Sequence, residues 1–88
     1  MNDEILEEAK VIAREIISLC FDISYEPLNE TAGAIEIDIR KAKNIGSIKN
    51  AIDEITIILG EVDSNDPDET DIINQINELL TRLDEEFL

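Results

Sequence analysis

Carboxylates are the side chains in this sequence that are numerous enough to do chemistry. The 88 residues contain 22 Asp and Glu against seven Lys and Arg, with no His and a single Cys, so the formal net charge is −15. Carboxylates can coordinate hard cations, act in pairs as general acid and base, or bind the cationic groups of a partner. Because His is absent, the commonest metal ligand and the commonest general base are both missing. We therefore expect a binding protein rather than an enzyme, with no cofactor.

The densest acidic segment runs from residue 61 to residue 71 and precedes an expected helix. Read as a calcium loop that begins at Asp63, it has Asp68 where an EF-hand requires Gly and Asn74 where an EF-hand requires a bidentate Glu. We therefore expect no metal site, and we interpret the segment either as a solvated loop and helix cap or as a contact surface for a basic partner. Its carboxylates are Glu61, Asp63, Asp66, Asp68, Glu69 and Asp71.

A second group of carboxylates belongs to an expected N-terminal helix, where each lies outside the apolar stripe. Carboxylates that project from a rigid helix can occupy the positions in which a nucleic-acid-binding protein expects phosphates. The alternative is that the acidity only keeps a small protein in solution. The candidate residues for partner binding in this group are Glu4, Glu7, Glu8 and Glu15.

Residues 40–52 carry a net charge of +4, between residues 1–39 at −8 and residues 53–88 at −11. A Gly46-Ser47 turn at the start of a helix could present backbone N–H groups to a phosphate, although the spacing of a P-loop is missing. The alternatives are contact with the acidic surface of a second copy, or helix ion pairs of Glu36 with Arg40 and Lys49 with Asp53. The candidate residues for an anion or a subunit contact are Arg40, Lys41, Lys43, Ser47 and Lys49.

Cys20 and Tyr25 are the remaining residues with reactive or hydrogen-bonding side chains of note. A lone cysteine excludes a disulfide within the chain. Cys20 lies beside the first apolar stripe, and no neighbouring base or electropositive group would activate it, so we expect an inert core thiol. Tyr25, the only tyrosine, is expected at a turn, where it would anchor an interface or cap the core.

Apolar residues recur every three or four positions from Ile5 to Ile23, which predicts a helix over about residues 3–23. Pro27 then predicts a turn over 24–30, because proline lacks an N–H donor and disfavours helical conformation in the residue before it. Residues 34–40 fit both a helix and an alternating strand. We favour the helix, since a strand here would have nothing to pair with except the same strand of another copy.

A further helical stripe covers residues 45–62, but its register does not continue that of residues 35–42. The two stripes therefore cannot belong to one straight helix. We expect a kink or a break near Gly46, within residues 44–47, and Ser47 is a candidate N-cap for the helix that follows.

The last helix has a complete start signal. Asp66 at the N-cap, Pro67 at the first helical position and Glu69 at the third form an Asp-led analogue of the capping box, and Gly60 ends the preceding helix. The sequence thus predicts one domain over residues 1–88 that is all-α, a small antiparallel bundle of three helices, or of four if the break separates the middle one. The expected helices cover about residues 3–23, 31–60 with a break at 44–47, and 67–86.

The net charge directs the functional expectation. It favours basic partners and works against direct binding of nucleic acid or anionic membranes. The leading hypothesis is an inhibitor-type protein that occupies the basic, nucleic-acid-binding surface of a partner, such as a phage anti-defence or anti-CRISPR protein or a toxin immunity protein. The alternatives are a homo-oligomeric adaptor or assembly chaperone and, more weakly, a nucleotide-sequestering protein that uses residues 40–49. With no apolar run near the roughly 18 residues of a membrane span and no signal peptide, we expect a cytoplasmic location, in the host cell if the protein is phage-encoded.

Overall fold

Four helices make up most of the structure, a computed structural model that describes residues 2–63 and 65–87. They are α1 (Asn2–Cys20), α2 (Glu26–Lys41), α3 (Ile45–Leu59) and α4 (Pro67–Glu86). No strand occurs among these described residues, so the predicted all-α fold is confirmed. Residues 34–40 lie inside α2, which confirms the helical alternative for the ambiguous segment.

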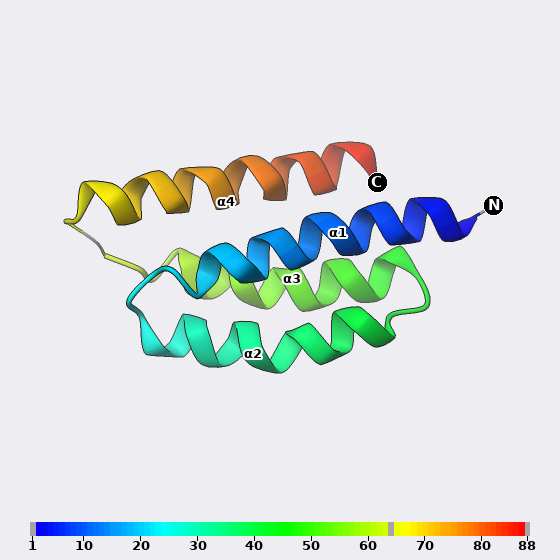
Figure 1. The fold of residues 1–88 in the computed structure, drawn as a ribbon, viewed down its shortest axis with the longest axis horizontal. Coiled ribbons are helices and arrows are strands. Elements are labelled where there is room, and N and C mark those ends of the chain that lie inside the picture. Colours follow the sequence, from blue (N-terminus) through cyan, green and yellow to red (C-terminus); the bar gives the residue numbers. More distant parts are fainter. Residues whose placement is uncertain (1, 64, 88) are drawn as a thin grey trace.

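The helices lie side by side along the longest axis of the molecule, which measures 44 × 23 × 17 Å (Figure 1). α1 packs against each of the other three helices, and α2 and α3 also pack against each other. α4 runs antiparallel to α1 (Figure 1), and it also approaches α3, where Lys49 Nζ lies 3.8 Å from Asp84 Oδ1. The central helix is therefore α1, and part of its surface stays open between α2 and α4.

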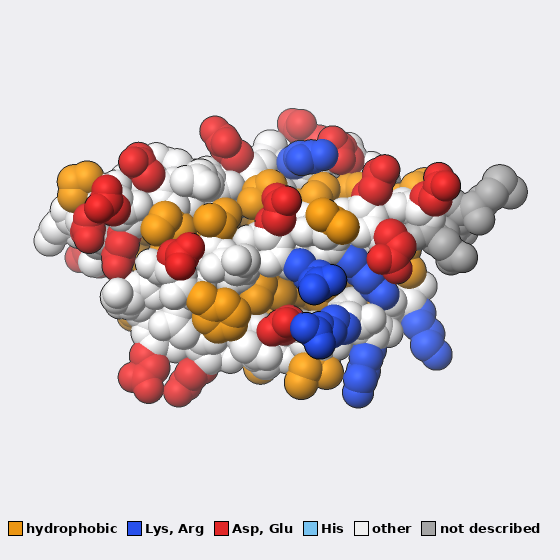
Figure 2. Space-filling model, in the orientation of Figure 1, with side chains coloured by type: hydrophobic (Ala, Val, Ile, Leu, Met, Phe, Trp, Pro, Cys, Tyr) orange, Lys and Arg blue, Asp and Glu red, His pale blue; other side chains and the backbone are white. Residues whose placement is uncertain are grey.

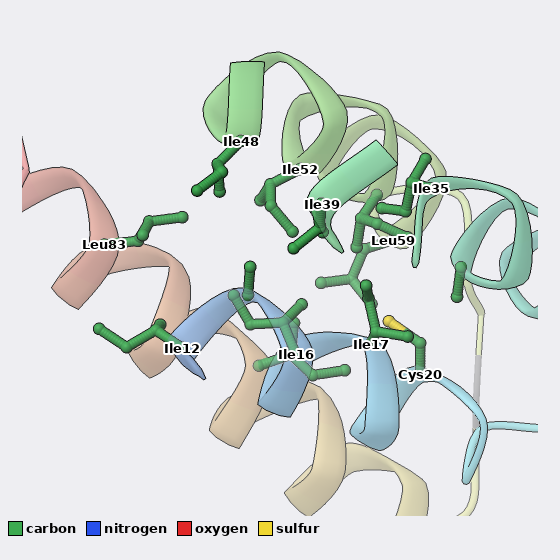
Figure 3. Packing of buried hydrophobic residues seen from close by; sticks show 14 of the residues in the cluster. Ile12, Ile16, Ile17, Cys20, Ile35, Ile39, Ile48, Ile52, Leu59 and Leu83 are labelled. Carbon is green, nitrogen blue, oxygen red and sulfur yellow. The ribbon is translucent and has the colours of Figure 1, made fainter. Parts of the chain in front are cut away.

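The core forms where the apolar stripes of the helices converge. Figure 3 shows Ile16 and Ile17 of α1 pointing towards the same interior as Ile39 of α2, Ile52 of α3 and Leu83 of α4. All five side chains are buried, and no polar or charged side chain is buried in the described part of the chain. Burial of aliphatic side chains of this size contributes about 1.5–3 kcal/mol each, so the helices are stabilised by their apolar faces and not by their charged ones.

The first turn is shorter than the sequence predicts, because α1 ends at Cys20 and α2 already begins at Glu26. Pro27 does not hold the chain in a turn, since it occupies the first turn of α2, where its missing N–H is not needed. The half-buried Asn29 closes the turn. Its Nδ2 donates to the carbonyl oxygen of Cys20 at 2.8 Å and to that of Ile23 at 3.0 Å. This side chain therefore joins α2 to the last carbonyl of α1 and to a carbonyl of the turn.

The break between α2 and α3 lies earlier in the chain than the sequence predicts. The helical conformation stops after Lys41 and resumes at Ile45, so Gly46 is an ordinary position in the first turn of α3. The prediction of Ser47 as the N-cap is wrong, because Asn44 is the cap. Its Oδ1 accepts from the Ser47 backbone N–H at 2.8 Å and from the Ser47 hydroxyl at 3.1 Å.

The start of α4 agrees with the sequence. Asp66 is the N-cap, its Oδ1 accepts from the Asp68 backbone N–H at 2.9 Å, and Pro67 is the first helical residue. Gly60 likewise follows the last residue of α3, in a right-handed conformation that requires no glycine. Among the described residues, no helix is long and apolar enough to cross a membrane.

Candidate protein-binding surface

The predicted carboxylates of the N-terminal group lie on the open face of α1. Glu4, Glu7, Glu8 and Glu15 are all exposed. They follow the helical period on the side opposite the buried residues Ala9, Ile16 and Cys20, which pack into the core. The structure therefore brings these four carboxylates onto one side of one rigid element.

The carboxylates of the second predicted group lie around the connection between α3 and α4. All six are exposed or half-exposed, and some of them stabilise the fold. Asp66 caps α4, and Glu69 Oε2 accepts a hydrogen bond from the backbone N–H of Ser24 at 3.1 Å. That bond joins the start of α4 to the turn between α1 and α2. The group is Glu61, Asp63, Asp66, Asp68, Glu69 and Asp71.

The two acidic groups do not form one continuous surface. The N-terminal turns of α1 lie at the end of the molecule where α4 finishes, whereas the α3–α4 connection lies at the other end (Figure 1). Along an axis of 44 Å the two groups are therefore separate features. A partner that contacts Glu4, Glu7 and Glu8 meets the C-terminal part of α4 rather than the acidic connection.

That neighbourhood contains a groove, which we call the α1–α4 groove. It has a volume of about 770 Å³. Its apolar residues are Ile12 and Phe87, which are buried, and Ile5 and Val11, which are 46% and 55% exposed. Its charged residues are four carboxylates and one guanidinium, which give a net charge of −3. These are Glu7, Glu8, Glu15, Glu86 and Arg82.

The groove continues along the same helix pair. A second hollow of about 370 Å³ shares Glu15 and adds Leu19 of α1 with Glu78 and Leu79 of α4. Figure 2 shows the resulting pattern on this face, a row of hydrophobic side chains between α1 and α4 with carboxylates on both sides of it. Glu78 and Glu86 of α4 were not among the candidate residues predicted from the sequence. Val11 was the available signal, because it is an apolar residue on the polar side of the first stripe.

The basic residues gather at the other side of α1, around the end of α2 (Figure 2). The predicted pair Glu36–Arg40 is present, with Arg40 Nη2 2.9 Å from Glu36 Oε1. The predicted ion pair of Lys49 with Asp53 is absent, although the structure describes both residues. Lys49 Nζ instead lies 3.8 Å from Asp84 Oδ1 of α4.

The first turn of α3 offers little to a phosphate. A depression of about 600 Å³ is lined by Lys41, Lys43 and Ser47, but Asp38 and Glu54 line it as well. The Ser47 N–H and hydroxyl are both donated to Asn44, so they are not free to bind an anion. An anion in this depression would face two carboxylates alongside the two lysines, which weakens the electrostatic attraction.

Cys20 and the carboxylates form neither an exposed thiol nor a metal-binding cluster in the described part of the chain. Cys20 is fully buried, and burial raises the pKa of its thiol from 9.0 to about 12. The thiol is therefore protonated and shielded at neutral pH. Within residues 4–63 and 65–87, no three Cys, Asp or Glu side chains come together in a way that could hold a metal ion. Tyr25, at the turn between α1 and α2, is half-buried against the core.

Comparison with other proteins adds no relative. No protein-family model matches the chain, and no curated protein or solved structure matches it either.

Proposed function

We propose that this chain is a non-enzymatic binding protein of the inhibitor type, which occupies a basic, nucleic-acid-binding surface of a partner protein. The observation that carries the proposal is that the carboxylates are exposed and mostly outside ion pairs. The sequence has 22 carboxylates, and none of those that the structure describes is buried. Eight of the ten candidate carboxylates form no ion pair with any described residue, namely Glu4, Glu7, Glu8, Glu15, Glu61, Asp63, Asp68 and Asp71. A surface with so many carboxylates outside ion pairs attracts cationic surfaces over distances of about a Debye length, roughly 10 Å at 0.1 M salt.

The rigidity of the elements supports the same proposal. The candidate carboxylates of α1 project from a helix that packs on all three others, so the backbone positions from which they project are fixed relative to one another. A partner that normally binds nucleic acid expects negative charges at fixed spacing along a phosphate backbone. Carboxylates on a central helix meet that requirement at a smaller entropic cost than carboxylates on a loop.

Capture from cell lysate, followed by a displacement assay, tests the proposal. The immobilised protein is expected to retain basic proteins, and retention should weaken steeply between about 0.05 M and 0.3 M salt. Added in solution, the protein should then displace labelled double-stranded DNA from the captured partner. The Glu7→Gln/Glu8→Gln variant should displace less DNA. Recovery of no protein other than the chain itself, or binding that is indifferent to salt, would contradict the proposal.

The exposed apolar side chains favour a second candidate, a homo-oligomeric adaptor or assembly chaperone. Phe21, Ile37 and Ile57 are 50%, 55% and 69% exposed, and Lys41 and Lys43 form no ion pair with any described residue. These side chains would suit contact with an acidic and apolar face of another copy. Light scattering after size exclusion tests this candidate, because an oligomer must give a multiple of 9.9 kDa. A monomer at high concentration would rule it out.

A further inference from the structure

The α1–α4 groove combines exposed apolar side chains with a net charge of −3. Ile5 and Val11 lie half-exposed in it, with the buried side chains of Ile12 and Phe87 beneath them. Single exposed apolar residues are common and need no explanation, but a row of them along a helix pair is typical of an interface. The apolar lining of the groove follows α1 from the half-exposed Ile5 through the buried Ile12 to the half-buried Leu19.

The length of the groove fits a helix of a partner. The distance from Ile5 to Leu19 along α1 is about 21 Å, at a rise of about 1.5 Å per residue, which matches about four turns of a helix laid parallel to it. An amphipathic helix of that length presents apolar residues on one side at positions i, i+3, i+4 and i+7. Those residues would contact the apolar row between α1 and α4.

The charges around the groove select the polar side of that helix. Glu7, Glu8 and Glu15 form no ion pair with any described residue, and Glu78 extends the acidic edge along α4. The one guanidinium in the groove, that of Arg82, has its Nε 3.2 Å from Glu86 Oε1. A bound helix with Lys or Arg flanking its apolar side would pair with the carboxylates on both sides of the row.

The same charges argue against a two-fold contact in which the grooves of two copies face each other. If two α1–α4 grooves faced each other across a two-fold axis, a net charge of −3 on one copy would lie against a net charge of −3 on the other. Like charges brought together at an interface cost several kcal/mol.

We propose that the α1–α4 groove binds a basic amphipathic helix of a partner protein, with the helix's apolar side on Ile5, Val11 and Leu19 and its cations on Glu8 and Glu15. This inference rests on the proposed function, since it names the structural element through which the basic partner binds. It excludes the acidic α3–α4 connection from the primary contact.

A designed peptide tests the groove directly. The probe is a fluorescently labelled peptide of about 18 residues with Leu at i, i+3, i+4 and i+7 and Lys elsewhere, and its control has the same composition in scrambled order. Fluorescence anisotropy at low salt measures both dissociation constants. The patterned peptide is expected to bind at least about tenfold more tightly than the scrambled one, because only it presents its apolar residues on one side.

Two matched pairs of variants locate the binding. Ile5→Ser/Val11→Ser removes apolar surface from the groove, and Ile37→Ser/Ile57→Ser removes it from exposed positions of α2 and α3 outside the groove. Glu8→Gln/Glu15→Gln removes two charges from the groove, and Glu30→Gln/Glu54→Gln removes two exposed charges elsewhere. Each groove variant should raise the dissociation constant about tenfold, and each control by less than about twofold. Thermal melts confirm that every variant is folded.

The other outcomes separate the inference from the proposed function. If both peptides bind equally and all charge variants weaken them alike, the groove assignment is wrong, while binding of basic partners stands. If neither peptide binds even at low salt, both are wrong. If the wild-type protein is a dimer that Ile5→Ser/Val11→Ser dissociates, the groove holds a second copy, and the assignment to a basic helix is overturned.

Discussion

Replacement of Asn29 by Ala tests whether one side chain holds the turn between α1 and α2. Asn29 Nδ2 donates to two carbonyl oxygens, at 2.8 Å to Cys20 and at 3.0 Å to Ile23. Each of these carbonyls keeps a backbone donor, since the Ile23 N–H reaches Cys20 O at 3.3 Å and the Tyr25 N–H reaches Ile23 O at 2.9 Å. The substitution therefore removes two hydrogen bonds without leaving a carbonyl wholly unpaired.

The size of the effect follows from those two bonds. A hydrogen bond contributes about 0.5–1.5 kcal/mol net, so the two together should lower the free energy of unfolding by about 1–3 kcal/mol. Ala is also a better helix former than Asn by up to about 0.7 kcal/mol, which offsets part of the loss. Asn50→Ala, at an exposed position within α3, carries the same propensity gain without the hydrogen bonds. The difference between the two variants isolates the contribution of the turn.

Thermal unfolding followed by circular dichroism provides the assay. A loss of 1 kcal/mol lowers Tm by about 4–8 °C in a domain of this size, so Asn29→Ala should melt at least several degrees below Asn50→Ala. Asn29→Asp should be less stable still at pH 7, because a carboxylate cannot donate and would face the two carbonyl oxygens. Equal Tm values for Asn29→Ala and Asn50→Ala would refute the reasoning.

Three further predictions concern stability. Asp66→Ala should lower the free energy of unfolding by about 1 kcal/mol in urea titrations, because α4 loses its N-cap. Asp66→Asn should retain most of the wild-type stability, because Asn is also a good N-cap. Equal losses in the two variants would contradict the role of Asp66 as the cap. The free energy of unfolding should rise as salt increases from about 0.01 M to 0.1 M, because salt screens the repulsion among the carboxylates. Over this range the Debye length falls from about 30 Å to 10 Å. A free energy that does not change with salt would mean that this repulsion is small. Burial raises the pKa of the Cys20 thiol to about 12 in the folded state, whereas the unfolded thiol ionises near pH 9. Between about pH 9 and pH 12, unfolding therefore releases a proton from this thiol. The free energy of unfolding should therefore fall by up to about 1.4 kcal/mol per pH unit above pH 9. Urea titrations across that pH range should show that Cys20→Ala lacks this part of the pH dependence.

The helices could be predicted from the sequence because their signals are local. Apolar spacing places Ile16, Ile52 and Leu83 on buried faces, and all three are buried. The Asp66-Pro67 start of α4 lies where its capping signal predicts. The ends of helices were predicted less well. Asn44 and Ser47 are both good cap residues, and only the placement of α2 against α3 decided that the chain turns before Asn44.

The candidate surface was predicted only in part. The exposure of Glu7, Glu8 and Glu15 follows from the period of α1, since a residue opposite a buried stripe remains in solvent. Their position beside Glu86 does not follow from that period, because it depends on α4 packing antiparallel on α1. Sequence separation is no guide to such neighbours.

The sequence by itself determined the helical class, the apolar faces and the excess of carboxylates, because each depends on residue type and on spacing within a few positions. Tertiary structure alone decided which charges meet. Lys49 lies near Asp84 of α4, 35 residues away, rather than Asp53 in its own helix, and Lys10 Nζ donates to the Arg40 carbonyl oxygen at the end of α2. The physical reason is that packing of the apolar faces sets the positions of the helices, and exposed charges, whose pairing contributes little energy, take the neighbours that packing provides.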